Sequence, residues 1–333
     1  MINSSQKLNP NVFDAKVEKV PIRKGFGEGL LLAAEENPNI VGLCADLTES
    51  TKMDLFAKRF PERFVEIGVA EQNLASVASG MAAMGKIPFI SSYAMFSPGR
   101  NWEQIRTTIC YNDRPVVIAG SHAGVSVGAD GGTHQAIEDI AITRVIPNMI
   151  VISPCDYIEA RKATIAAAGL GKPVYIRLAR EGTAVMTTEE SPFLVGKAEL
   201  YYGDEIAKAD AGIVATGALL YKALKVAETL KSQGISVKVL NVSTIKPIDV
   251  WAVSDLAKTC GALVTVEEHQ IAGGLGSAVS EVVSQNFPVP IEFIGVKNLF
   301  GQSGTQNELL EHYEMGESHI ETAVKKVIGR KNT

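Results

Sequence analysis

Short runs of apolar residues alternate along this chain with longer segments in which apolar positions recur every three or four residues. The short runs are rich in Val and Ile and are bounded by turn residues, as buried strands are, whereas the longer period is that of helices. In the first half, strands are predicted at 39–46, 64–69, 87–93, 115–120, 149–154 and 173–179. Helices are predicted between them at 24–37, 71–84, 101–112 and 156–169. This alternation indicates βα units and a parallel sheet.

A polar, turn-rich stretch at 182–197 interrupts the pattern, after which a second alternation begins. Its predicted strands are 211–217, 237–243, 262–268 and 291–296, and its predicted helices are 219–234, 249–260, 273–285, 305–315 and 317–329. The expected fold class is α/β with two domains, each a mostly parallel sheet flanked by helices. The predicted ranges are 15–185 for the first domain, 186–198 for a linker and 199–333 for the second domain.

Composition narrows the class of protein. Of 333 residues, 46% are hydrophobic and 21% charged, as in globular proteins, and the formal net charge of −5 offers no general attraction to nucleic acid or an anionic membrane. No apolar run approaches the ~20 residues of a membrane-spanning helix, and the N-terminus has no apolar signal-peptide core. The four cysteines lack CxxC or short metal-type spacing. This favours a reduced, cytoplasmic setting over disulfides or zinc, so we expect a cytoplasmic protein.

The first candidate for chemistry is FVEIGVAEQN, where an apolar strand gives way to a helix of small residues and Glu71 lies at the joint. A Glu in the first turn of a helix complements the helix dipole, and this is the commonest reason for one. The strand that ends at Tyr93 is followed by two more aromatic residues, Phe96 and Trp102. A carboxylate at such a joint with aromatic rings nearby predicts a slot for a flat, basic heterocycle.

The second candidate is the glycine-rich stretch AGSHAGVSVGADGGTHQAIED, which follows a predicted strand and carries His122, Asp130 and His134. Open α/β sheets bind ligands at the carboxyl ends of their strands. Each histidine could hydrogen-bond, carry a proton or, if charged, meet a phosphate. No third and fourth ligand lies at useful spacing, so no metal site is predicted in this chain. The later GGLG at 273–276 is interpreted as a structural turn, because it is not a dinucleotide-binding motif.

Taken together, several motifs resemble the transketolase family in order and spacing. They are VPIRKGFGEGLL, GLCADLTES, IGVAEQN, SYAMFSPGRNWEQIR, SHAGVSVGADGGTHQAIED and VYIRLAREG, followed by STIKPID and VEEHQIAGGLG, which resemble its C-terminal domain. The resemblance runs from about residue 15 to the end. It implies a pyrimidine-binding domain followed by a transketolase C-terminal domain. It also implies thiamin diphosphate chemistry, in which a two-carbon ketol unit moves from a ketose phosphate to an aldose.

The resemblance assigns roles toward the cofactor. Glu71 would hydrogen-bond the aminopyrimidine ring nitrogen and favour the tautomer that activates the thiazolium carbon; the cofactor would supply the organic chemistry. Tyr93 and Phe96 would pack on the aminopyrimidine. Trp102 would take a third aromatic position if one residue is inserted in SPGRNW, and Asp46 would lie near the thiazolium end.

The resemblance also assigns roles toward a sugar phosphate. Arg23, Ser50, His122 and Arg180 fall on the positions that bind the phosphate, and arginine offers a planar donor fork for its oxygens. Asp130 matches a residue that binds a ketose hydroxyl. His134 matches a histidine near the reacting carbonyl, so Glu71, His122 and His134 are the expected catalytic residues. Pentose phosphates are the default substrates, and an unusual sugar phosphate would use the same residues.

The chain departs from a full transketolase, which is roughly twice as long. It contains neither Gly-Asp-Gly nor a pair of adjacent asparagines, the motifs that hold Mg²⁺ and the diphosphate in the family. Because such a unit needs dedicated oxygen ligands, we expect a separate N-terminal subunit to supply them, with active sites at the interface of an α2β2 heterotetramer. The small residues after Glu71 would suit helix packing at that interface, and packing within the domain would explain them equally well.

Alternatives remain open from the sequence. A β subunit of the decarboxylating component of 2-oxo acid dehydrogenases and deoxyxylulose-phosphate synthase share the AEQ joint with this chain. The ADGGTHQ loop and the arginine set favour a sugar phosphate over a 2-oxo acid, and deoxyxylulose-phosphate synthase is normally one long chain. A non-catalytic subunit with the same fold is a third alternative. His269, His312 and His319 receive no role and are expected to be solvated or at interfaces.

Overall fold

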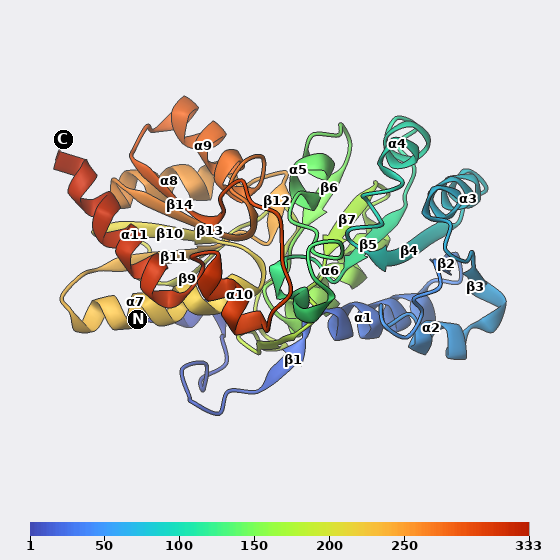
Figure 1. The fold of residues 1–333 in the computed structure, drawn as a ribbon, viewed down its shortest axis with the longest axis horizontal. Coiled ribbons are helices and arrows are strands. Elements are labelled where there is room, and N and C mark those ends of the chain that lie inside the picture. Colours follow the sequence, from blue (N-terminus) through green and yellow to red (C-terminus); the bar gives the residue numbers. More distant parts are fainter. Residues whose placement is uncertain (333) are drawn as a thin grey trace.

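The computed structural model describes residues 1–332 and contains two mostly parallel sheets that lie side by side (Figure 1). The first sheet has seven strands in the order β12-β6-β7-β5-β4-β2-β3. All its pairings are parallel except that of β12 with β6. The strands are β2 (Ile40–Cys44), β3 (Phe64–Glu66), β4 (Ile87–Tyr93), β5 (Val117–Ser121), β6 (Ile150–Ile152), β7 (Val174–Arg177) and β12 (Thr244–Lys246).

Helices cover both faces of this sheet. They are α1 (Ile22–Glu36), α2 (Asp54–Arg59), α3 (Glu71–Ala83), α4 (Trp102–Gln104), α5 (Asp139–Arg144) and α6 (Tyr157–Gly169), with a π-helical segment at Ile105–Cys110. Ile40 packs with α1, α2 and α6 on one face, while its neighbour Val41 packs with α3 and α5 on the other. This two-residue alternation buries both faces, as continuous apolar strands of parallel sheets require.

The second sheet has five strands in the order β14-β13-β10-β11-β9. They are β9 (Glu199–Tyr202), β10 (Ala211–Ala215), β11 (Val237–Asn241), β13 (Leu263–Gln270) and β14 (Ile291–Val296), of which β9 is an antiparallel edge strand. The helices are α7 (Leu220–Ser232), α8 (Val250–Cys260), α9 (Leu275–Asn286), α10 (Gln306–His312) and α11 (Glu317–Gly329). α7 and α11 pack on one face. α8 and α9 pack on the other and share one apolar core with α3 and α5 of the first sheet.

The predicted α/β class with two mostly parallel sheets is confirmed, but two segments cross between the halves of the chain. β12 follows β11 in sequence and yet extends the first sheet, where Thr244 pairs with Ile152. The N-terminal residues lie against the second sheet, since Val12 is buried in its core and Asn3 N–H donates to the Tyr201 carbonyl at 3.0 Å (Figure 1). The exact limits of the predicted domains stay a prediction.

Smaller elements complete the fold. The short strands β1 (Lys19–Pro21) and β8 (Gly182–Ala184) pair with each other, and short 3-10 helices lie at Ser4–Gln6, Pro61–Arg63, Val125–Asp130, Gly217–Leu219 and Arg330–Asn332. The single helix predicted at 101–112 is instead α4 followed by the π-helical segment. Within residues 1–332, no helix has the length and apolar character needed to cross a bilayer.

Candidate functional site

The candidate residues gather along the carboxyl edge of the first sheet. Its neighbouring parallel strands β7, β5, β4, β2 and β3 all end at this edge, where open α/β sheets bind ligands. Each strand is followed by, or ends on, at least one of the predicted residues. In strand order these are Arg180, His122, Tyr93, Asp46 and Glu71. Residues far apart in sequence are thus brought together by strand order.

Four rings form a cluster over this edge. Tyr93 stacks on His122 with 3.8 Å between ring centroids and 24° between planes, and the Phe96 centroid lies 6.0 Å from that of Tyr93. His134 meets Phe96 edge-on at 5.3 Å. The two histidines of the glycine-rich loop therefore converge on the two aromatic residues after β4. The cluster offers flat apolar faces beside groups that can carry a proton.

Positive charge concentrates around His122. This histidine is 2% exposed, and burial together with Arg23 and Arg180 lowers its pKa to about 3, so it is neutral at physiological pH. Burial and the neighbouring Arg180 also lower the pKa of half-buried Arg23. Arg23 donates to the Ser50 carbonyl, and its buried Nε has no hydrogen-bond partner in residues 1–332. Gathered cations with an unpartnered donor are the electrostatic pattern of an anion site.

Arg180 is tied to the glycine-rich loop. Its Nη1 donates to the Val127 carbonyl at 2.7 Å and to Asp130 Oδ1 at 3.2 Å, while its Nε lies 3.6 Å from Glu181. Arg180 and Asp130 are each about one-third exposed. The structure therefore places Arg23, Ser50, His122, Asp130, His134 and Arg180 around one region.

Glu71 begins α3 and is 4% exposed. Arg100 Nη1 donates to both of its carboxylate oxygens, at 3.1 and 3.3 Å. An open hollow of about 510 Å³ is lined by these two side chains and by residues 69–73. A buried carboxylate that faces a hollow suits the predicted flat, basic heterocycle, and Arg100 links it to the ring cluster, since its guanidinium carbon lies 4.2 Å from the Phe96 ring centroid. Arg100 was not singled out from the sequence, where an Arg in a loop carries no distinguishing signal.

Asp46 lies beyond β2 on an exposed turn with φ of 57°. Its N–H donates to Glu66 Oε1 at 2.7 Å, which also accepts from Gly68 N–H at 2.9 Å, while Glu66 Oε2 accepts from Thr48 Oγ1 at 3.0 Å. Glu66 thus joins the turn after β2 to the turn before Glu71. Sequence reasoning missed this residue because it lies within a predicted strand.

Trp102 is placed differently from the other predicted aromatic residues. Its Nε1–H donates to the Ile142 carbonyl at 2.6 Å, and its ring packs against the core shared by the two sheets. The ring contacts of Tyr93 and Phe96 within residues 1–332 do not include it. Within this chain, the structure does not bring Trp102 to the ring cluster.

The second half of the chain clamps the glycine-rich loop. Gln135 is 2% exposed, and its Nε2 donates to the carbonyls of Val125 and Gln302 at 3.0 and 2.9 Å. Glu268 Oε1 accepts from Ser126 N–H at 2.6 Å. Gly132 lies so close to residue 301 that an added Cβ would approach the Gly301 carbonyl oxygen to 2.5 Å. These contacts hold the loop that carries both site histidines, and no sequence motif predicts them.

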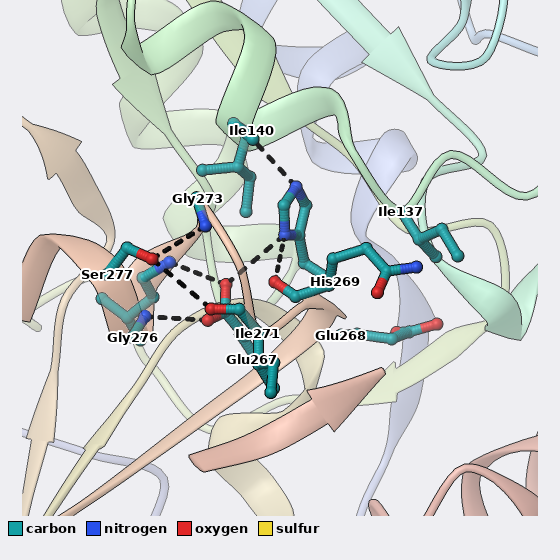
Figure 2. Close-up of polar contacts among 12 residues, drawn as sticks. Ile137, Ile140, Glu267, Glu268, His269, Ile271, Gly273, Gly276 and Ser277 are labelled. Carbon is teal, nitrogen blue, oxygen red and sulfur yellow. Dashed lines mark hydrogen bonds and ion pairs between the residues drawn. The ribbon is translucent and has the colours of Figure 1, made fainter. Parts of the chain in front are cut away.

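His269 belongs to β13 and is fully buried. Its ring points toward Ile140 of α5 in Figure 2, so it is an interface residue between the halves of the chain. Ala141 N–H donates to its Nε2 at 3.3 Å, so its Nδ1–H donates to the Gln270 carbonyl at 2.7 Å. Glu267 lies on the same side and accepts from the N–H groups of Leu275 and Gly276 at the start of α9, while Glu268 points away (Figure 2). GGLG is thus the start of a helix capped by a carboxylate, as the structural interpretation expected.

The side chains at this site suit a pyrimidine ring better than a metal ion with its diphosphate. Across residues 1–332, no group of three or more His, Cys, Asp or Glu side chains is arranged to hold a metal ion. Glu71, Tyr93 and Phe96 suit a pyrimidine ring, whereas a diphosphate with its metal ion needs oxygen ligands of another kind.

Family models match most of the chain. The transketolase pyrimidine-binding domain matches residues 18–184, and the transketolase C-terminal domain matches residues 205–320. This chain belongs to the transketolase family. A chain of Methanocaldococcus jannaschii, described as a transketolase C-terminal section, is 44% identical over 301 residues, which are 89% of this chain and 93% of that one. The 6-deoxy-6-sulfo-D-fructose transketolase subunit of Clostridium sp. is 38% identical over 320 residues, 96% of this chain and 98% of that subunit.

Solved structures agree with this family. One described as the inactive β4 tetramer of a split-gene transketolase is 43% identical, with a TM-score of 0.87, and the match covers 94% of this chain and 99% of that one. Transketolase of Campylobacter jejuni shares the fold at 22% identity, with a TM-score of 0.79, and there the match covers 97% of this chain and 50% of the longer one. The family and fold expected from the motifs are thus confirmed.

Proposed function

We propose that this chain is the C-terminal subunit of a split, thiamin diphosphate-dependent transketolase that moves a two-carbon ketol unit from a ketose phosphate to an aldose. The observation that carries the proposal is one arrangement at the carboxyl edge of the first sheet. A buried carboxylate faces a hollow, two aromatic rings lie at and after the end of β4, and two arginines with a neutral, buried histidine lie next to those rings. Relatives named as transketolase subunits match nearly their whole length to this chain.

In this proposal the residues toward the cofactor bind and orient it. Glu71 hydrogen-bonds the aminopyrimidine ring and shares a proton with its nitrogen, which a desolvated carboxyl group favours. Tyr93 and Phe96 offer the faces on which that ring packs, and Asp46 lies on the adjoining strand end. Thiamin diphosphate, when bound, supplies the carbon nucleophile that accepts the ketol unit.

The remaining residues bind the sugar and move its protons. Arg23, Arg180 and Ser50, together with His122, bind the phosphate, and Asp130 accepts a hydrogen bond from a ketose hydroxyl. His122 is neutral, so it meets the anion as a hydrogen-bonding group and not as a charge. His134, held against Phe96, carries protons to and from the sugar hydroxyls.

We further propose that a separate N-terminal subunit holds Mg²⁺ and the diphosphate, and that two copies of each subunit assemble. Three observations support this proposal. Gly-Asp-Gly and Asn-Asn are absent from the sequence, two relatives are themselves named as subunits and are matched over nearly their whole length, and a split-gene transketolase is described as an inactive β4 tetramer. On α3, Ser76, Gly80 and Ala83 are exposed, which would suit close packing against another helix. A cytoplasmic location stays a prediction.

The proposed substrates are sugar phosphates. Pentose phosphates are the default, but relatives are named for 6-deoxy-6-sulfo-D-fructose and for apulose 4-phosphate, at 38% and 35% identity. The relatives named as transketolase subunits favour this reading over a 2-oxo acid dehydrogenase subunit. Deoxyxylulose-phosphate synthases match this chain over about half their own length. Substitution of Glu71 tests whether the chain is an enzyme subunit or a non-catalytic subunit of the same fold.

A tagged pull-down from the native cell extract tests the proposal. We expect a near-stoichiometric partner whose sequence contains Gly-Asp-Gly and a downstream pair of asparagines. The purified complex should transfer ketol units between sugar phosphates in the presence of thiamin diphosphate and Mg²⁺, whereas this chain alone should not. A complex with such a partner but without ketol transfer on a panel of ketose phosphates would refute the proposed activity.

A further inference from the structure

Arg100 contacts two of the three groups that the proposed function assigns to the aminopyrimidine. Its Nη1 donates to both oxygens of Glu71, at 3.1 and 3.3 Å, and its guanidinium carbon lies 4.2 Å from the ring centroid of Phe96. The guanidinium is flat, rich in N–H donors and able to stack on an aromatic face. These are also the recognition features of an aminopyrimidine. Arg100 therefore makes the contacts that the cofactor ring would need.

The turn before α4 holds Arg100 close to Glu71. Asn101 is fully buried, and its Nδ2 donates to the Glu71 carbonyl at 3.0 Å and to Ser97 Oγ at 3.1 Å. Within this turn, Gly99 lies so close to the Met95 carbonyl that an added Cβ would come within 1.9 Å of its oxygen. The backbone on both sides of Arg100 is thus fixed at the start of α3. The long Arg100 side chain, in contrast, is 52% exposed.

Burial makes this pairing necessary in the chain without its cofactor. Glu71 is 4% exposed, and a buried carboxylate without a partner is costly. The nearby guanidinium offsets that cost. The same pairing opposes the proposed role of Glu71, because a carboxylate that is already paired shares a proton with a ring nitrogen less readily.

Resting on the proposed function, we infer that Arg100 is a placeholder for the aminopyrimidine: it pairs with Glu71 in the cofactor-free chain and is displaced when thiamin diphosphate binds. The side chain is half exposed, so it can swing toward solvent and leave the hollow of about 510 Å³ beside Glu71 to the ring. Displacement leaves Glu71 facing a neutral ring, which is the state that the chemistry needs. Arg100 is in this sense a positioning residue, which acts through Glu71.

The inference predicts two effects of opposite sign for Arg100→Met. In the isolated chain at pH 8, the midpoint of thermal unfolding should fall, because Glu71 loses its partner. In the complex with the N-terminal subunit, thiamin diphosphate with Mg²⁺ should bind more tightly by roughly tenfold in titration calorimetry, as expected when a competing state that holds ~90% of the molecules is removed. Arg100→Gln serves as a second variant if the Met variant folds poorly.

The matched control is Arg106→Met. Arg106 is exposed, lies six residues further along and has no ion pair within the described part of the chain, so its loss changes net charge equally. We expect neither measurement to change with this variant. In a Glu71→Gln background, Arg100→Met should no longer lower the unfolding midpoint, because a neutral side chain needs no counter-ion.

The outcomes separate the inference from the function on which it rests. If the native complex binds thiamin diphosphate and Arg100→Met leaves its affinity unchanged or weaker, the placeholder role is overturned while the proposed function stands. If the native complex does not bind thiamin diphosphate, the proposed function fails and the displacement fails with it. An unfolding midpoint unaltered by Arg100→Met would show that the pair does not stabilise Glu71, and would also overturn the inference.

Discussion

Two groups of buried charged residues in this molecule are built in opposite ways. Between the two sheets, Arg177 is 7% exposed and donates to Asp139 Oδ2 and to the Glu268 carbonyl, both at 2.8 Å. Tyr175 OH donates to the same Asp139 oxygen at 2.7 Å. At the carboxyl edge of the first sheet, two arginines and a neutral histidine gather instead.

The difference indicates what each region is for. Opposite charges that find each other inside one chain complete a structural joint, and the loss of either partner leaves an isolated buried charge. Like charges that converge repel each other, and an anion that binds among them relieves that repulsion. The first region is therefore expected to control stability, and the second to control binding and turnover.

The largest effect is expected from Glu71→Gln in the assembled enzyme. The amide cannot share a proton as the carboxyl group does, so ketol transfer should fall ~10²–10⁴-fold, the usual loss of acid–base help. Assembly with the partner should persist, as gel filtration would show. Glu103→Gln, an exposed glutamate on α4, controls for the change in charge and should leave the rate intact. Unchanged turnover in Glu71→Gln would refute the catalytic role assigned to Glu71.

A second test addresses the joint between the sheets. Arg177→Met leaves Asp139, which is 2% exposed, with only the Tyr175 hydroxyl, and should lower the free energy of unfolding by about 3–5 kcal/mol. Urea unfolding of the isolated chain measures it. Lys297→Met breaks an ion pair whose side chains are both about half exposed, and should cost no more than about 1 kcal/mol. An equal loss of unfolding free energy in the two variants would show that the buried ion pair stabilises the fold no more than the exposed one.

A third test uses the pH dependence of stability, which Glu159 controls where the two halves of the chain meet. Glu159 is 3% exposed and accepts from Cys155 N–H at 2.6 Å and Asn241 Nδ2 at 2.8 Å, and burial followed by nearby Asp156 raises its pKa to about 7. The folded chain therefore binds more protons than the unfolded chain between about pH 4.5 and pH 7, so stability from this group falls as pH rises through that window.

Glu159→Gln should remove this dependence, because an amide does not ionise. Its oxygen can accept from Cys155 N–H, and its NH2 can donate to Asn241 Oδ1 once that side-chain amide turns over. At pH 8 the variant should be more stable than the native chain by about 3 kcal/mol, and at pH 4 the two should be nearly equal. Denaturant unfolding across this pH range is the measurement. A constant difference between the two chains at all pH values would mean that Glu159 does not titrate in this window.

The smallest effect is expected from Arg180→Met in the assembled enzyme. Loss of a charged donor to the phosphate should raise KM for a phosphorylated substrate by roughly 10–100-fold, with a smaller change in kcat. The same substrate without its phosphate provides the control, because its KM should hardly change. An equal rise for both substrates would place Arg180 in loop structure, through its bond to the Val127 carbonyl, and not in phosphate binding.

The sequence predicted the helices and strands better than the contacts between their side chains. Strand and helix positions followed from apolar periodicity, and the motif set led to the family. A helix does follow residue 101, but its change from α4 to a π-helical segment was missed, because that change leaves no mark in a pattern with a period of 3.6. Trp102 was grouped with Tyr93 by nearness in sequence, whereas its indole donates to the Ile142 carbonyl.

What the sequence determined by itself is local: which segments are strands or helices, that Glu71 begins α3, and which residue types follow each strand. Only the tertiary structure decided which of these residues meet, because strand order and crossing segments set distances between parts that are far apart in the chain. It placed Arg100 on Glu71, His134 on Phe96 and Gln302 on Gln135. It also joined β12 to the first sheet, where the edge of β6 offers backbone hydrogen-bonding groups.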